Sequence, residues 1–224
     1  MQVIMKFMKP RIIAVIYFLI GIIYTLSETR LSLGIALALK GTIIPILILY
    51  YIINVGRSIN IPVLAALILS WAGDVAIDIS FIPGLACFLL AQIMYIIAFS
   101  QVHGISVVFY KRVYLLLPVI LYGLALVNLM YKNLDGMRIP VILYAIVILS
   151  MVVAAINRLN RVNRLSYFLV LSGAILFVIS DSLISITKFY SPFRYSGIAI
   201  MTTYIIAQYL IIQGIVKQSN PLTE

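Results

Sequence analysis

The stretch LSWAGDVAIDIS, residues 69–80, places two carboxylates, Asp74 and Asp78, inside a long apolar run. The chain around it is 64% hydrophobic and only 10% charged over 224 residues, and its mean hydropathy is +1.19. Soluble globular domains of this size do not reach such values. The sequence therefore predicts an all-α, polytopic membrane protein, with both acids inside one of its membrane-crossing helices.

Eight apolar runs are long enough to cross a membrane, because a transmembrane helix needs roughly 20 apolar residues. The expected spans are residues 11–28, 32–54, 61–81, 83–102, 113–131, 139–157, 166–187 and 195–216. The third and fourth spans meet at residues 82–84, Ile-Pro-Gly, where a tight reversal is expected. No linker or low-complexity segment divides the chain, so we expect residues 1–224 to form a single domain, a bundle of eight helices.

The basic residues between the spans predict the orientation of the bundle. The side of the amino terminus has ten of them, Lys6, Lys9, Arg11, Arg57, Lys111, Arg112, Arg158, Arg161, Arg164 and Lys217. The other side has five, Arg30, Lys132, Arg138, Lys188 and Arg194. The positive-inside rule therefore predicts that both termini face the cytoplasm, in agreement with an even number of spans. In a bacterium, such a multi-pass protein is expected in the plasma membrane.

The same basic residues do not indicate a nucleic-acid partner, although the net charge is +10. They fall in short gaps rather than on one face with interleaved aromatic residues, which is the pattern that follows a phosphate backbone. A single cysteine, Cys87, and a single histidine, His103, allow neither an internal disulfide nor a His/Cys zinc site, and we expect no cofactor. Any chemistry must use carboxylates and neutral polar groups.

Polar residues within the spans gather at one predicted depth, since a helix rises about 1.5 Å per residue and counts from the span ends can be compared. One layer, in the half of the membrane away from the cytoplasm, contains Lys40, Asp74, Gln92, Asp181 and Tyr204. A carboxylate at the middle of a span costs about 2.5–3.5 kcal/mol and nearly always faces the bundle interior or water. We therefore expect a polar pocket in this layer, with Asp78 at its mouth, one turn from Asp74, and with Tyr95 contributing a hydroxyl.

Each candidate also has a structural interpretation. Lys40 can neutralise one aspartate in a buried ion pair, Trp71 can be a packing or interface residue, and serines within spans often bond one helix to another. No histidine stands near Ser70 or Ser180 in the sequence to activate either hydroxyl, so a serine nucleophile is not expected.

Two longer motifs resemble a known family. Residues 70–99, SWAGDVAIDISFIPGLACFLLAQIMYIIAF, resemble the central signature of the YhhN-type lysoplasmalogenase family, and residues 172–189, SGAILFVISDSLISITKF, resemble its second signature. The segments IPVILYAIVILSMVVAA and YIIAQYLIIQG also fit, so the resemblance covers nearly the whole chain. The chain departs from the family pattern at Gln92, where members commonly have a histidine, and at Gly41, where a proline often follows the lysine of the second span.

This resemblance implies an integral membrane hydrolase that cleaves the vinyl ether bond of lysoplasmalogens and releases a fatty aldehyde and a glycerophospho-base. Its implied partners are a lysophospholipid substrate and the lipid bilayer. One carboxylic acid and one carboxylate suit this reaction, because the first can protonate the double bond and the second can orient water. We expect Asp74 and Asp181 to be this catalytic pair. Lys40 or Tyr204 would hold the phosphate or glycerol end, and Asp78, Gln92 and Tyr95 would line the substrate site.

Two other classes of function fit the same residues. Carboxylates and a lysine at mid-depth also form ion pathways, which favours a proton-coupled transporter or lipid carrier. Such a carrier is expected to have paired broken helices in two related halves. The loose similarity of the two aspartate motifs is the only sign of an internal repeat in the sequence. A non-catalytic lipid-binding or assembly protein is the third class, and it requires that the aspartates serve in structural ion pairs.

Overall fold

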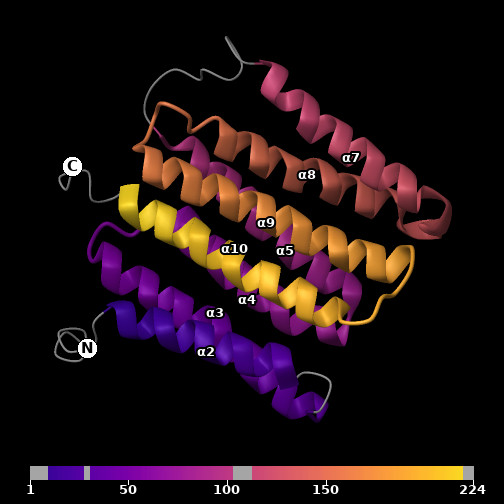
Figure 1. The fold of residues 1–224 in the computed structure, drawn as a ribbon, viewed down its shortest axis with the longest axis horizontal. Helices are drawn as coiled ribbons and strands as arrows, with labels where there is room; N and C mark the ends of the chain where they lie inside the picture. Colours follow the sequence, from indigo (N-terminus) through magenta and orange to yellow (C-terminus); the bar gives the residue numbers. More distant parts are fainter. Residues whose placement is uncertain (1–9, 28–30, 103–112, 219–224) are drawn as a thin grey trace. The chain divides into compact units, whose positions relative to one another are not determined.

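The computed structural model describes residues 10–27, 31–102 and 113–218, and within these ranges it contains helices and no strand. The long helices are α2 (Pro10–Ser27), α3 (Leu33–Val55), α4 (Ile61–Ile79), α5 (Phe81–Ser100), α7 (Leu116–Met130), α8 (Arg138–Ile156), α9 (Arg164–Phe189) and α10 (Ser196–Gln218) (Figure 1). Short 3-10 turns flank α7, namely η2 (Val113–Leu115), η3 (Tyr131–Asn133) and η4 (Asp135–Met137).

Eight helical segments in the described ranges are long and apolar enough to cross a membrane. The fifth of them, Val113–Asn133, combines α7 with the turns on either side. The prediction of an all-α protein with eight membrane-crossing helices is therefore confirmed. The orientation of the termini stays a prediction. Several residues that the sequence arguments use lie outside the described ranges: Lys6, Lys9, Arg30, His103, Lys111 and Arg112.

The chain forms two compact units, Met1–Ala91 and Gln92–Glu224. The first contains α2, α3, α4 and the beginning of α5, and the second contains the remainder of α5 with α7, α8, α9 and α10. The expectation that residues 1–224 form a single domain depends on how these two units pack together, and it stays a prediction.

Asparagine caps start one helix in each unit. The Asn60 side chain accepts a hydrogen bond from the backbone N–H of Val63 at 3.2 Å at the start of α4, where Pro62 occupies the first turn. The Asn163 side chain accepts one from the backbone N–H of Ser166 at 2.7 Å at the start of α9. An asparagine cap satisfies a backbone N–H in the first turn that has no partner within the helix. Proline is tolerated in this first turn because it has no N–H that would need a partner.

The reversal between the third and fourth spans lies earlier than predicted. Helix α4 ends at Ile79 and α5 begins at Phe81, so the chain turns at Ser80 rather than at residues 82–84. The backbone N–H of Ser80 still bonds the carbonyl of Ala76 at 2.8 Å, and Pro83 falls in the first turn of α5. A proline in the first turn removes no helical hydrogen bond. The Ile-Pro-Gly motif therefore marks the start of α5 and not the turn between the two helices.

A missing hydrogen bond in α3 is supplied by α4. Pro45 lies inside α3 and has no N–H to donate to the carbonyl four residues earlier, at Gly41. The indole Nε1–H of Trp71 donates to this carbonyl oxygen at 2.8 Å. Neighbouring side chains commonly satisfy backbone groups that a proline frees within a membrane helix. Trp71 therefore has a specific bonding role that the sequence pattern did not reveal.

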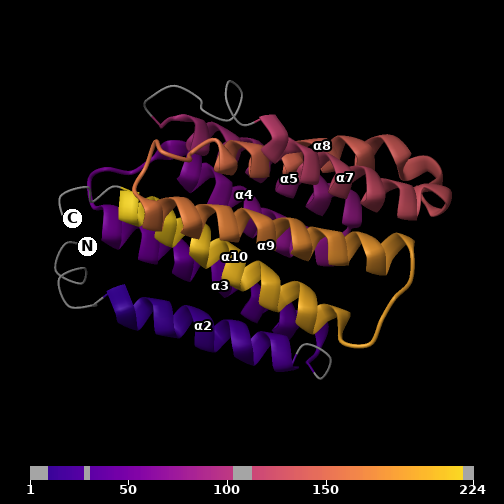
Figure 2. The same ribbon diagram turned by 45° about the horizontal axis from the view of Figure 1, so that its top comes forward.

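In the unit Gln92–Glu224, α9 and α10 are the most extensively paired helices and lie side by side in both views (Figures 1 and 2). Two glycines permit this approach. A Cβ at Gly173 would lie 2.8 Å from the carbonyl oxygen of Ala207, and one at Gly214 would lie 2.6 Å from a methyl carbon of Val170. Because real Cβ atoms do not come this close, larger residues at either position would push the two helices apart.

A buried arginine ties together the ends of three helices in the same unit. Arg158 follows α8 and is only 1% exposed. One of its terminal nitrogens donates to Ser166 Oγ at 2.9 Å on α9 and to Gln218 Oε1 at 2.8 Å on α10. Burial, and secondarily the charge of Arg161, lower the pKa of Arg158 to about 10, so it stays charged at neutral pH. Both of these acceptors are neutral groups, so the hydrogen bonds that hold the guanidinium at this helix junction come from uncharged side chains.

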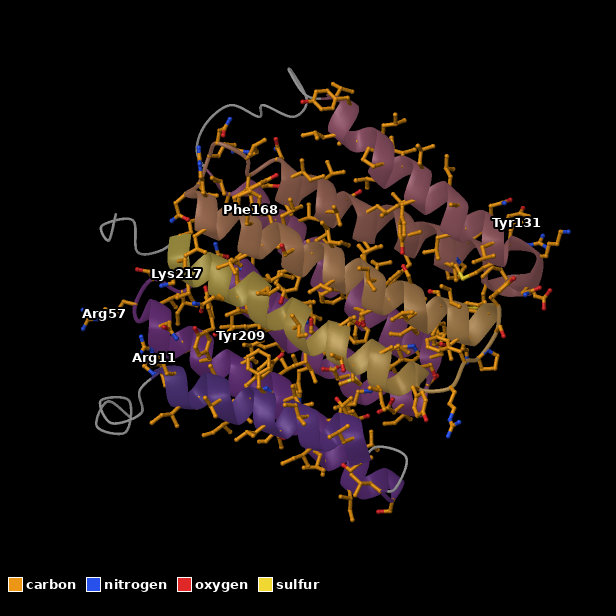
Figure 3. The ribbon with its side chains drawn as sticks, in the orientation of Figure 1. Arg11, Arg57, Tyr131, Phe168, Tyr209 and Lys217 are labelled. Carbon is orange, nitrogen blue, oxygen red and sulfur yellow. The ribbon has the colours of Figure 1, made fainter. Side chains whose placement is uncertain are left out.

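Labelled side chains mark the ends of each unit. In Met1–Ala91, Arg11 near the start of α2 and Arg57 after α3 lie at the same end (Figure 3). In Gln92–Glu224, Lys217 in the last turn of α10 and Tyr131 after α7 lie at opposite ends (Figure 3). Within each unit, these positions agree with helices that run up and down in alternation.

Candidate functional site

The centre of the candidate site is Asp181, a carboxyl group on α9 that is only 7% exposed. The Tyr144 hydroxyl on α8 donates a short hydrogen bond to Asp181 Oδ2. Gln92 Nε2 on α5 donates to the same oxygen at 3.0 Å and to the Tyr144 hydroxyl oxygen at 2.6 Å. Three helices thus each contribute one side chain to a closed triangle of hydrogen bonds around the carboxyl group.

Sequence analysis predicted two corners of this triangle, Gln92 and Asp181, and missed the third. Tyr144 lies six residues after Arg138, the first residue of α8, so the same depth count would have placed it near this layer. It was not distinguished because the chain has fifteen tyrosines, many of them near span ends where aromatic belts form. Depth gives the level of a residue, whereas the hydrogen bond also depends on which side of α8 faces α9.

Gln92 has a further polar atom that points to the chemistry of the site. The residue is fully buried, and its Oε1 has no hydrogen-bond partner among the described residues. A buried acceptor without a donor costs about 1–3 kcal/mol. Beside Asp181, this oxygen is suited to accept a hydrogen bond from a water molecule or from a hydroxyl group of a bound molecule.

A second buried polar group lies on the same unit. The Tyr95 hydroxyl donates to Gln208 Oε1 at 2.6 Å, and Gln208 Nε2 donates to the Tyr204 hydroxyl oxygen at 3.3 Å. The Phe177 ring packs edge-on against both tyrosines. Tyr95 is one helical turn from Gln92 on α5, so the two polar groups share a face of that helix. The structure brings together the predicted Tyr95 and Tyr204 through Gln208, which sequence analysis did not single out.

The serines beside Asp181 make other contacts. Ser180 Oγ donates to the carbonyl oxygen of Ile200 at 3.0 Å. Ser182 Oγ donates to the carbonyl oxygen of Val178 at 2.7 Å and accepts from the Tyr122 hydroxyl at 2.7 Å. These bonds orient both hydroxyls toward helix backbone, as is typical of serines that join or stabilise membrane helices.

The unit Met1–Ala91 contains the other predicted residues. Lys40 Nζ on α3 donates to both carboxylate oxygens of Asp78 on α4, each at 2.9 Å. Asp74, one turn earlier on α4, is only 3% exposed, and Ser70 Oγ, one turn before that, is buried without a partner in the described part of the chain. The ion pair considered for Lys40 therefore exists, and its acid is Asp78.

Six of the predicted residues thus fall into three bonded groups. Gln92 joins Asp181, Tyr95 joins Tyr204 through Gln208, and Lys40 joins Asp78. Asp74 belongs to the first unit and Asp181 to the second, so their expected pairing stays a prediction.

Comparison with known proteins gives one family and several relatives. The sequence profile of the YhhN family matches residues 35–215. "Lysoplasmalogenase TMEM86B" from Homo sapiens is 29% identical over 162 residues, which are 71% of this chain and 65% of that protein. "Lysoplasmalogenase TMEM86A" from Bos taurus is 34% identical over 113 residues, 49% of this chain and 47% of that protein. The matched regions therefore span less than two thirds of either relative. No solved structure matches the chain.

Proposed function

Because the chain belongs to the YhhN family, we propose that it is a membrane hydrolase that cleaves the vinyl ether bond of lysoplasmalogens, releasing a fatty aldehyde and a glycerophospho-base. The observation that carries this proposal is the carboxyl group of Asp181, buried among apolar helices and bonded by Gln92 and Tyr144. Buried acids of this kind in membrane helices usually serve a function. The names of the human and bovine relatives support the same reaction.

The proposed reaction needs an acid and a positioned water molecule. A proton is added to the vinyl carbon that is not bonded to oxygen, which leaves a cation shared between the adjacent carbon and the ether oxygen. Water adds to this carbon and loses a proton, and the resulting hemiacetal splits into aldehyde and alcohol. One water molecule is consumed, and the proton that was added is returned.

Asp74 and Asp181 are the proposed catalytic pair, one as the proton donor and the other as the carboxylate that stabilises the cation and orients water. Two carboxyl groups in a medium of low dielectric do not readily both ionise, so a shared proton suits such a pair. Gln92 and Tyr144 hold Asp181 in place. Gln92 Oε1, buried without a partner among the described residues, is the proposed acceptor for the water molecule.

The polar end of the lipid has proposed contacts as well. Tyr204 and Lys40 would hold the glycerol and phosphate groups, with Tyr95 and Asp78 beside them. Lys40 is bonded to Asp78, whose side chain is 32% exposed, so a phosphate would compete with this carboxylate for the ammonium group. Tyr204 keeps its position through Gln208 and Tyr95.

Aldehyde release from a defined lysoplasmalogen by the purified protein in detergent tests the proposal. Asp74→Asn and Asp181→Asn should each abolish release while thermal unfolding stays cooperative. The double variant should be no worse than either single variant, because residues that act as one catalytic unit are strongly non-additive. Substantial turnover in both single variants would refute the pair. Absence of release by the unaltered protein would refute the reaction.

A proton-coupled carrier is the second candidate, and one observation favours it. Helix α3 contains Pro45 and carries the buried Lys40 of an intramembrane ion pair, and charged residues within membrane helices often mark ion pathways. Aldehyde release in detergent, without a second compartment, would exclude a pure carrier.

A further inference from the structure

A long apolar groove lies in the unit Gln92–Glu224, where α7, α8 and α9 meet. Its volume is about 440 Å³, within the range of small-molecule sites. Its lining includes Leu115, Val119, Val152, Tyr167, Ile175 and Ile179. We call it the α7–α9 groove. Apart from two tyrosines and one proline, its lining residues are all aliphatic.

The groove is elongated and open at the surface of this unit. From Tyr167 to Ile179 it follows α9 for roughly 18 Å, at 1.5 Å per residue. Ile175 and Ile179 on its wall are 44% and 38% exposed. An apolar groove of this length accommodates one extended hydrocarbon chain better than a compact ligand. A chain can also enter from the side, because the groove has an open wall.

One end of the groove lies one turn from the candidate site along α9. Tyr122 lines the groove, and its hydroxyl donates to Ser182 Oγ at 2.7 Å. Val178, also in the lining, lies three residues before Asp181 and four before Ser182 on α9. Residues at these spacings are neighbours on a helix surface. The hydroxyl groups of the groove lining belong to Tyr167 and Tyr122, and the Tyr122 end lies within one helical turn of Asp181 along α9.

We propose that the α7–α9 groove holds the hydrocarbon chain of the lysolipid substrate, with its ether end beside Tyr122 and Asp181 and its tail toward Tyr167. The proposal rests on the proposed function and adds where the chain lies. Lipid tails are as apolar as the groove, so the groove gains little affinity over the bilayer. Its effect is to fix the position of the vinyl ether relative to Asp181, and such positioning contributes to the rate.

A second groove provides an internal comparison. It lies on the other side of the α7–α8 contact, has a volume of about 520 Å³, and is lined by Ile120, Leu124, Ile142, Ile146 and Val153 among others. Its one hydroxyl side chain, Ser150, donates to the carbonyl of Ile146 on its own helix at 2.7 Å. Among the described residues, no side chain that lines this larger groove is hydrogen-bonded to a neighbour of Asp181 on α9, as Tyr122 is. The α7–α9 groove is therefore proposed as the chain site because of its position beside Asp181 on α9, and not because of its volume.

Matched tryptophan substitutions test the position of the chain. Ile175→Trp fills the α7–α9 groove from an exposed position, and Ile146→Trp, 59% exposed in the native protein, fills the other groove. Ile175→Trp should lower kcat/KM by about tenfold for a long-chain lysoplasmalogen but not for an analogue whose chain is too short to reach residue 175. Ile146→Trp should change neither. Equal losses for both chain lengths, or equal losses in both variants, would overturn the proposal.

A crosslinking experiment tests lipid binding in the groove independently of the reaction. A saturated alkyl lysophospholipid with a photoreactive group in mid-chain cannot be hydrolysed, and it should label α7 or α9 residues of the groove in competition with unlabelled lipid. Ile175→Trp should reduce this labelling, and Ile146→Trp should not. Labelling in the groove without aldehyde release would refute the proposed function and support the groove. Aldehyde release with competitive labelling elsewhere would support the function and overturn the groove.

Discussion

Tyr144 is the residue whose role can be isolated most cleanly. It donates to Asp181 and accepts from Gln92, and it is 7% exposed. Tyr144→Phe removes one hydroxyl and leaves the ring in place. We expect a loss of about 100-fold in aldehyde release, at the lower end of the loss that removal of a single preorganised donor causes. The measurement is kcat/KM with a lysoplasmalogen, and the control is Ser150→Ala, which removes a hydroxyl that donates to the carbonyl of Ile146 on its own helix. Unchanged kcat/KM in Tyr144→Phe would contradict a role for this bond.

Gln92 can be tested by the residue that the family commonly has at this position. A neutral imidazole has one donor and one acceptor nitrogen, so Gln92→His can replace both the bond to Asp181 and the free acceptor atom. Turnover should persist at alkaline pH and fall at acidic pH, where the imidazole takes up a second proton and loses its acceptor nitrogen. The measurement is the pH profile of kcat for both proteins. A profile identical to that of the unaltered protein would contradict the acceptor role.

The site was partly predictable at this scale. Buried acids are rare in apolar helices, so Asp181 could be identified from composition, and depth counting added Gln92. Tyr144 and Gln208 could not be identified in this way, because tyrosine and glutamine are compatible with many positions. The partner of Lys40 was also undetermined, since Asp74 and Asp78 are one turn apart on the same helix and differ little in depth.

At the scale of elements, the hydrogen bond from Trp71 to the Gly41 carbonyl joins α4 to α3. This carbonyl is open to Trp71 because Pro45 has no N–H to donate to it. Trp71→Phe should lower the free energy of unfolding by about 1–3 kcal/mol, because the carbonyl loses its partner. In a Pro45→Ala background the alanine N–H can bond this carbonyl, so the same substitution should cost less. A double-mutant cycle of unfolding in detergent measures the difference. Equal costs in both backgrounds would show that Trp71 stabilises the protein by packing alone.

The helices themselves were the most predictable feature, because a membrane imposes a length and an apolar composition that few other structures share. The junctions were less so. Pro83 indicated a helix start, yet the turn lies at Ser80, since proline tolerates every position of the first helical turn. The close approach of α9 and α10 depends on glycines whose spacing in sequence does not identify the helix that they face.

For the whole molecule, the charge distribution predicts that both termini face the cytoplasm. Cys87 is the single cysteine, so Cys87→Ser gives a background for labelling with a membrane-impermeant thiol reagent. In that background, Arg194→Cys, between α9 and α10, should be labelled in intact cells. Arg57→Cys, between α3 and α4, should be labelled only after permeabilisation. The cysteine-free protein is the control, and the reverse pattern would contradict the predicted orientation.

The open wall of the α7–α9 groove has a consequence for what happens after bond cleavage. Under the proposed reaction, the long-chain aldehyde can diffuse sideways into surrounding hydrocarbon, whereas the glycerophospho-base dissolves in water. The two products then separate into different phases, and their recombination becomes improbable without any further energy input. Inhibition by the aldehyde should follow its mole fraction in the lipid or detergent phase rather than its concentration per volume of solution, so that adding inert micelles relieves it.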